Sequence, residues 1–156
     1  MTLSIFRRAL IALSLVAFGT ASAQQGVVPT MGKEFWIGFM EGYQGGAISS
    51  LNIFISSPVN TSGTLVMPLT GYTQSFSVTA NVTTTLTFPT VNTAMNFGSE
   101  VIDDKSVLIT TQDTVAVFAI NFEQYTADAA VIYPRQSLGT DYRVFCYNGY
   151  PGISTL

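Results

Sequence analysis

The segment "TVAVFAINF", residues 114–122, decides the fold that the sequence predicts. Both of its alternating sets are apolar: Val115, Val117 and Ala119 on one side, Ala116, Phe118 and Ile120 on the other. A strand that is apolar on both sides is typical of a central position between two layers. We therefore expect a two-sheet sandwich. A continuous apolar helix is the alternative, and the β-branched residues together with the preceding "TTQD" argue against it.

Flanking segments show the simpler alternation of a half-buried strand. Leu51, Ile53 and Ile55 alternate with polar residues, and so do the apolar residues of 73–79 and 82–88. Prolines and glycines close most of these segments, as expected at strand ends. The fold class is thus all-β, an antiparallel two-sheet β-sandwich. Strands are expected near 34–40, 50–57, 63–68, 73–79, 82–88, 106–111, 114–121, 128–133 and 141–148.

The pattern of the strands expected at 73–79 and 82–88 limits the length of the connection between them. Both place hydroxyl side chains on odd-numbered positions and apolar ones, such as Phe76 and Leu86, on even-numbered positions. If the two strands form a hairpin, their connection must therefore contain an odd number of residues or a bulge.

The first 23 residues have the composition of a secretory signal peptide. Arg7 and Arg8 precede the apolar run 9–18, and Ala21-Ser22-Ala23 forms a small-residue cleavage site. We expect export to the cell surface or the extracellular space, one domain over residues 24–156, and no membrane span in the mature chain. A retained membrane anchor is the alternative for the leader.

The charges of the mature chain exclude several classes of partner. The chain has six basic and nine acidic residues, and the leader removes two basic ones, so the mature net charge is 4 − 9 = −5. Nucleic acid and anionic lipid are therefore not expected to bind. There is no histidine, which removes serine–histidine catalysis and the usual zinc sites. Cys146 is the only cysteine, so no internal disulfide forms.

The stretch "GKEFWIGFMEGYQGG", residues 32–46, raises the question of a ligand platform. Phe35, Ile37 and Phe39 alternate with Trp36, Gly38 and Met40, so a core strand is the preferred interpretation. Trp36 is expected to lie over a glycine of the neighbouring layer. The following loop leaves Tyr43 as a candidate contact residue.

A calcium site is the only cofactor that the sequence suggests. Glu100, Asp103 and Asp104 cluster in "SEVIDDKS", residues 99–106, and carboxylates are hard oxygen ligands. No complete calcium-loop motif is present, and an ordinary turn explains the same residues.

Five segments in order resemble the N-terminal domain family of the IgGFc-binding protein, in the form found in large secreted proteins of Bacteroidetes-type bacteria. They are "GKEFWIGFMEGY", "LNIFISSPVNTSGT", "SFSVTANVTTTLTFP", "SEVIDDKSVLITTQDTVAVFAINFEQYTADAAVIYP" and "LGTDYRVFCY". The resemblance implies an extracellular β-rich domain of adhesion and recognition proteins. It also implies further strands after "NGYPGISTL", so we expect a truncated part of a larger multidomain protein with unpaired sheet edges.

These observations favour a non-enzymatic adhesion or recognition module that binds an extracellular protein or glycan through loops such as 41–49, 57–63 and 123–128. In "FEQYTAD", residues 122–128, the expected contact residues are Glu123, Tyr125 and Asp128. One alternative is a carbohydrate-active enzyme or carbohydrate-binding module that uses carboxylates. Another is a structural spacer domain of a surface filament.

Overall fold

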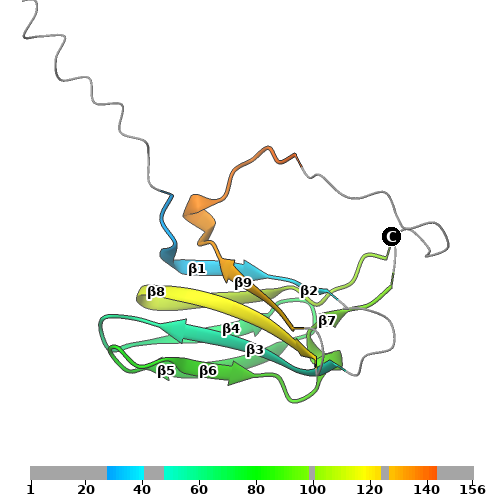
Figure 1. Cartoon of the computed structure of the whole chain (residues 1–156), viewed down its shortest axis with the longest axis horizontal. Helices are drawn as coiled ribbons and strands as arrows, with labels where there is room; N and C mark the ends of the chain where they lie inside the picture. The colour runs from blue at the N-terminus through cyan, green and yellow to red at the C-terminus, as the bar shows by residue number, and fades with distance from the viewer. Residues whose placement is uncertain (1–27, 41–47, 99–100, 124–126, 144–156) are drawn as a thin grey trace, which may run out of the picture.

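The protein is described by a computed structural model that covers residues 28–40, 48–98, 101–123 and 127–143. This part of the chain is built from strands and two short 3-10 turns (Figure 1). Within it, no helix is long and apolar enough to cross a membrane. The elements are β1 Met31–Ile37, β2 Phe39–Met40, β3 Ile48–Ser56, β4 Thr61–Met67, β5 Tyr72–Val78, β6 Thr84–Thr87, η1 Val91–Thr93, β7 Met95–Asn96, β8 Val107–Glu123, β9 Ala127–Ile132 and η2 Arg135–Ser137.

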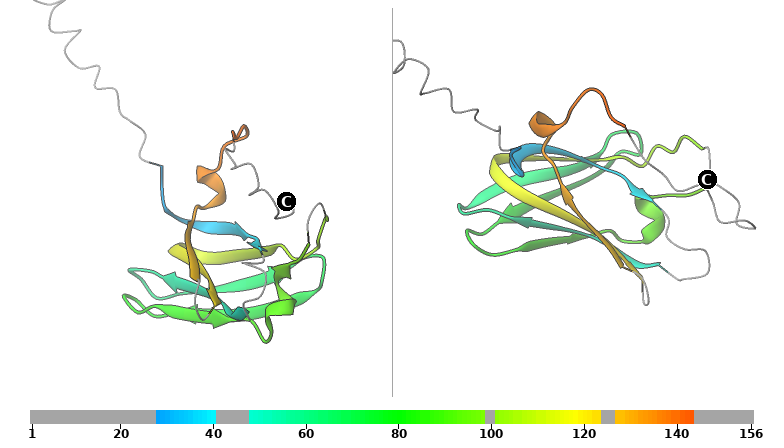
Figure 2. Two further views of the ribbon diagram at one scale, coloured as in Figure 1. Left: turned by 45° about the vertical axis from the view of Figure 1, so that its right-hand side comes forward. Right: turned by 45° about the horizontal axis from the view of Figure 1, so that its top comes forward.

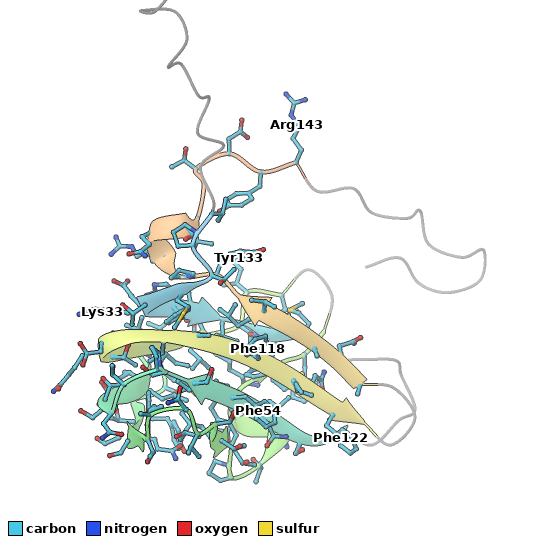
Figure 3. All side chains as sticks on the ribbon, turned by 60° about the vertical axis from the view of Figure 1, so that its left-hand side comes forward. Lys33, Phe54, Phe118, Phe122, Tyr133 and Arg143 are labelled. Atoms are coloured by element: carbon cyan, nitrogen blue, oxygen red, sulfur yellow. The ribbon has the colours of Figure 1, made fainter. Side chains whose placement is uncertain are left out.

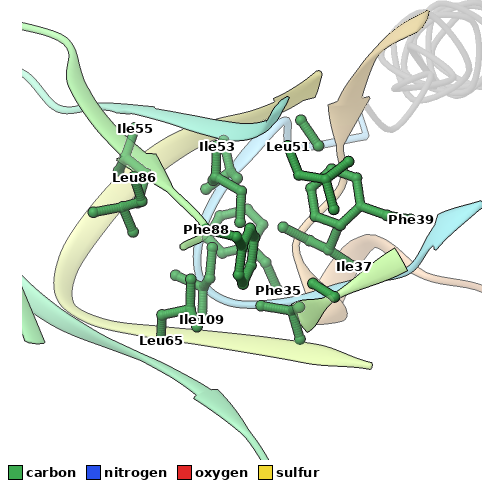
Figure 4. Packing of buried hydrophobic residues seen from close by; sticks show 14 of the residues in the cluster. Phe35, Ile37, Phe39, Leu51, Ile53, Ile55, Leu65, Leu86, Phe88 and Ile109 are labelled. Atoms are coloured by element: carbon green, nitrogen blue, oxygen red, sulfur yellow. The ribbon is translucent and has the colours of Figure 1, made fainter. Parts of the chain in front are cut away.

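Strand β8 pairs with more strands than any other strand of the described part. Its first half pairs antiparallel with β1 and β4, and its second half pairs antiparallel with β3 and β9. β5 pairs with β4 and adds a strand to the sheet beside the first half of β8. β6 pairs with β3 and adds a strand beside the second half. β8 curves around the core, so its two halves lie on opposite sides of the buried side chains (Figures 2 and 4). The expected antiparallel sandwich is thus confirmed, with one strand shared by its two layers.

The bend in β8 lies at residues 111–114, where Lys33 of β1 stands opposite four residues of β8. Three side chains from other segments of the chain bond to the backbone there. Lys33 Nζ donates a hydrogen bond to Gln112 O at 2.6 Å, and Ser57 Oγ donates to Thr114 O at 3.1 Å. The Asp113 N–H donates to Thr61 Oγ1 at 3.0 Å. These bonds satisfy backbone groups that the interrupted ladder leaves without partners.

One hydrophobic core fills the space between the two halves. It takes residues from β1 and β4 on one side, such as Phe35 and Leu65, and from β3 on the other, such as Ile53. Phe39 and Phe88 meet in an edge-to-face contact, with ring centroids 5.7 Å apart. The buried residues of β8 are the odd-numbered Val107, Ile109, Val115, Val117 and Ala119.

The structure corrects the prediction that residues 114–121 are buried on both sides. The odd-numbered side of this segment faces the core, whereas Phe118 on the even-numbered side is 42% exposed. The predicted strands 106–111 and 114–121 are also one continuous strand. The reason is that the core forms inside the curve of β8, which leaves its outer side uncovered.

The hairpin considered for 73–79 and 82–88 does not form. β5 pairs with β4 and β6 pairs with β3, so the connection between them crosses from one layer to the other. Even-numbered residues of both strands do face the core, as the alternation predicts. Trp36 likewise departs from its prediction. It is 43% exposed and points away from the core that Phe35 and Ile37 enter.

Candidate functional site

The outer side of the β3–β8–β9 half-sheet carries an apolar surface. The cross-strand register aligns Phe54, Phe118 and Val131 in one row, and Asn52, Ile120 and Ala129 in the next. A third row aligns Ser50, Phe122 and Ala127. We call six of these residues the apolar face: Phe54, Phe118, Ile120, Phe122, Ala129 and Val131.

The apolar face is open to solvent. Phe118 is 42% exposed, Phe122 47% and Val131 45%, while Phe54 and Ile120 are half-buried (Figure 3). Large exposed apolar side chains that gather on one surface mark an interaction site more often than scattered ones do. Directly opposed side chains in a sheet lie about 5 Å apart, and successive same-side residues of a strand about 7 Å apart, so the three rows form one continuous surface.

A shallow hollow of about 310 Å³ indents this face. It is lined by Phe54, Ser56, Thr83, Phe118, Ile120 and Ala129. None of the lining residues is charged. Ala129 leaves space in the hollow because its side chain ends at Cβ. The hollow is therefore suited to an apolar group from a partner rather than to an ion.

Polar side chains border the apolar face along β3 and β6. Thr87 Oγ1 donates to Asn52 Oδ1 at 2.7 Å, and Asn52 Nδ2 donates to Ser50 Oγ at 2.8 Å. The described strand residues that point to this side of the β3–β6–β8–β9 half include no charged side chain. An apolar centre beside an uncharged polar border is the arrangement of many protein–protein interfaces.

Described residues that flank the predicted contact loops lie close together at one end of the sandwich. Met40 pairs with Asn96, its carbonyl accepts from Asn121 Nδ2 at 3.0 Å, and Ile48 lies opposite Glu123. The end of β2, the start of β3, the end of β7 and the end of β8 therefore share this end of the sandwich. The connection 57–60, part of the predicted loop 57–63, lies instead beside the bend of β8.

Some of the predicted site residues lie within the described part of the chain, and others lie outside it. Asp128 is exposed on β9. Tyr43, Glu100 and Tyr125 lie outside the described residues, as do Cys146 and the leader, and for Glu123 only the backbone is described. The contact roles of these residues stay predictions. Most of the predicted strand 141–148 also lies outside; the described residues 141–143 are not in a strand.

Asp103 and Asp104, the two described residues of the predicted calcium site, lie in a turn that Lys105 fastens. Lys105 Nζ lies 3.3 Å from Asp103 Oδ2, donates to Met95 O at 2.9 Å and sits 5.0 Å from the Phe97 ring centroid. Desolvation raises the pKa of Asp103, but the Lys105 hydrogen bond and charge and the backbone bonds outweigh it, so this pKa lies below its usual range. Among the described residues, no group of three or more His, Cys, Asp or Glu gathers around one point.

The fold and the surface define an all-β sandwich with an exposed apolar side, and comparisons add no closer assignment. No family model matches the sequence, and neither a curated protein nor a solved structure matches it. Function is therefore argued from the surface itself.

Sequence reasoning missed the apolar face because it assigned Phe118 and Ile120 to a buried side. The sequence holds no signal that separates the two cases, because an apolar side chain on a strand looks the same whether or not a second layer covers it.

Proposed function

We propose that the chain is an exported, non-catalytic recognition and adhesion module of a cell-surface or matrix protein. It contacts a protein partner through the apolar face. The observation that carries this proposal is the exposure of Phe118, Phe122 and Val131 on one side of the sheet, together with half-buried Phe54. Aromatic side chains give large contact areas and are enriched at the centres of protein interfaces.

The apolar face reaches the end of β8, since Phe122 stands one residue before the last residue of the strand. Glu123 and Tyr125, two of the contact residues predicted from the sequence, follow Phe122 directly in the chain, so contacts by these residues are part of the proposal. The leader composition and the resemblance to the IgGFc-binding N-terminal domain family both support an extracellular role.

A bead-retention assay tests the proposal. Beads that carry the purified chain are passed over surfaces coated with mucin, with immunoglobulin Fc or with the chain itself. We expect retention on at least one coating, and the double variant Phe118→Ser/Phe122→Ser to lower it at least about tenfold, because truncated central contacts typically cost more than 1 kcal/mol each.

The matched control is Val59→Ser/Leu69→Ser. It removes two apolar side chains that are 47% and 69% exposed and lie outside the apolar face. Retention of this control should equal that of the wild type, and all proteins should unfold at similar denaturant concentrations. Equal retention of the double variant and the wild type, or no retention on any coating, would contradict the proposal.

A further inference from the structure

We infer that the partner of the apolar face is a second copy of the same face, packed on it about a two-fold axis. The inference rests on the proposed function and names the partner of the same site. It makes recognition homophilic: modules on neighbouring molecules bind each other.

Charge restricts where two copies can meet. The chain is acidic, with a formal net charge of −3, so most pairings of two copies bring like charges together. The apolar face is the exception, since its described residues and its polar border carry no charge. An uncharged face gives a charged partner no group to pair with, whereas a second apolar face brings no charge that would have to be desolvated.

Shape gives the second argument. Phe122 projects as a knob that is 47% exposed, and the hollow lies beside Phe118 on the same strand. The two positions are four residues apart, about 13 Å along β8. A two-fold axis that lies in the plane of the interface, perpendicular to β8 and level with Ile120, exchanges the two positions, so the Phe122 ring of each copy enters the hollow of the other.

The geometry of such a pair is that of two sheets packed face to face. Side chains from facing sheets interdigitate when the sheets are about 10 Å apart. The rows that contain Phe54, Phe118 and Ile120 would then lie at the centre of the interface. The hydrogen-bonded Ser50, Asn52 and Thr87 would lie at its border, where hydrogen bonds within each copy leave few polar groups to desolvate.

Sedimentation of the purified chain over a range of concentrations tests the inference. The wild type should form a dimer. Phe122→Ser removes the knob and Ala129→Trp fills the hollow; Ala129 is exposed, so the added ring does not disturb the core. Each variant should weaken dimerisation by at least about tenfold. Leu69→Ser, a loss of an exposed apolar side chain elsewhere, should not.

Mixing the two variants separates a two-fold interface from any other. In a dimer of either variant with itself, no Phe122 ring faces an open hollow. In the mixed dimer, Phe122 of the Ala129→Trp copy faces the open hollow of the Phe122→Ser copy. The mixture should therefore associate more tightly than either variant alone. A mixture no better than its components, or a wild type that stays monomeric up to about 100 μM, would overturn the inference. If the wild type is monomeric yet still retained on mucin or Fc through Phe118 and Phe122, the proposed function stands and the partner is a different protein.

Discussion

At the scale of single residues, two glycines with different surroundings show where packing is tightest. A Cβ at Gly63 would lie 2.5 Å from Thr110 O and 2.6 Å from Phe76 Cζ. The carbonyl belongs to the neighbouring strand and cannot move away without breaking the ladder. Gly38, by contrast, has no heavy atom closer than Asn96 Nδ2 at 4.0 Å.

Gly63→Ala should therefore lower the free energy of unfolding by about 1–3 kcal/mol, the usual cost of overpacking. Gly38→Ala is the control. It should leave stability unchanged or raise it by up to about 1 kcal/mol, because alanine reduces the freedom of the unfolded chain. Urea denaturation of both variants measures the difference, and equal effects of the two substitutions would show that the approach of β8 to β4 is looser than described.

At the scale of elements, β8 shows what the sequence predicts and what it does not. The apolar segment 114–122 correctly predicts a strand, but the prediction that both of its sides are buried is wrong, because Phe118 on the even side is exposed. The segment does not reveal that the strand continues from 107 to 123, because the polar residues "TTQD" look like an ordinary turn. Those residues instead form a bend whose backbone is bonded by Lys33, Ser57 and Thr61, which are distant in sequence.

Ser57 is the buried member of this set, with 4% of its surface exposed. Its Oγ donates to Thr114 O and accepts from the Val59 N–H at 3.3 Å. Ser57→Ala leaves both backbone groups unpaired and should cost about 1–3 kcal/mol of stability. Ser56→Ala removes the same atom from the outer side of β3 and should change stability by less than about 0.5 kcal/mol. Thermal unfolding compares the two; a cost for Ser57→Ala no larger than for Ser56→Ala would mean that the bend does not depend on this side chain.

At the scale of the whole molecule, the sequence predicts the fold class better than the arrangement of its layers. Alternation identifies the inward residues of β3, β5 and β6, since a period of two needs no tertiary information. Which strands pair is a different question. β5 and β6 are neighbours in sequence yet belong to different layers, and only the curve of β8 decides this.

The same limit applies to the candidate site. Sequence reasoning placed contacts in loops because loops commonly carry function. The register and one hydrogen bond bring Met40, Asn96 and Asn121 together at one end of the sandwich, which no spacing in the sequence indicates. The apolar face could not be predicted from the sequence for a further reason. An aromatic residue on a strand reads as buried unless the number of layers above it is known.

The odd side of β8 lines the core, and we propose that its even side forms the interaction surface. Comparing Val117→Asp with Phe118→Asp by chemical denaturation at pH 7, at a concentration where the chains are monomeric, tests this account most directly. Val117 is fully buried, so Val117→Asp should cost more than about 3 kcal/mol or prevent folding. Phe118→Asp should cost no more than about 2 kcal/mol, because the charge remains in solvent. Equal losses for the two neighbours, or a larger loss for Phe118→Asp, would contradict the account.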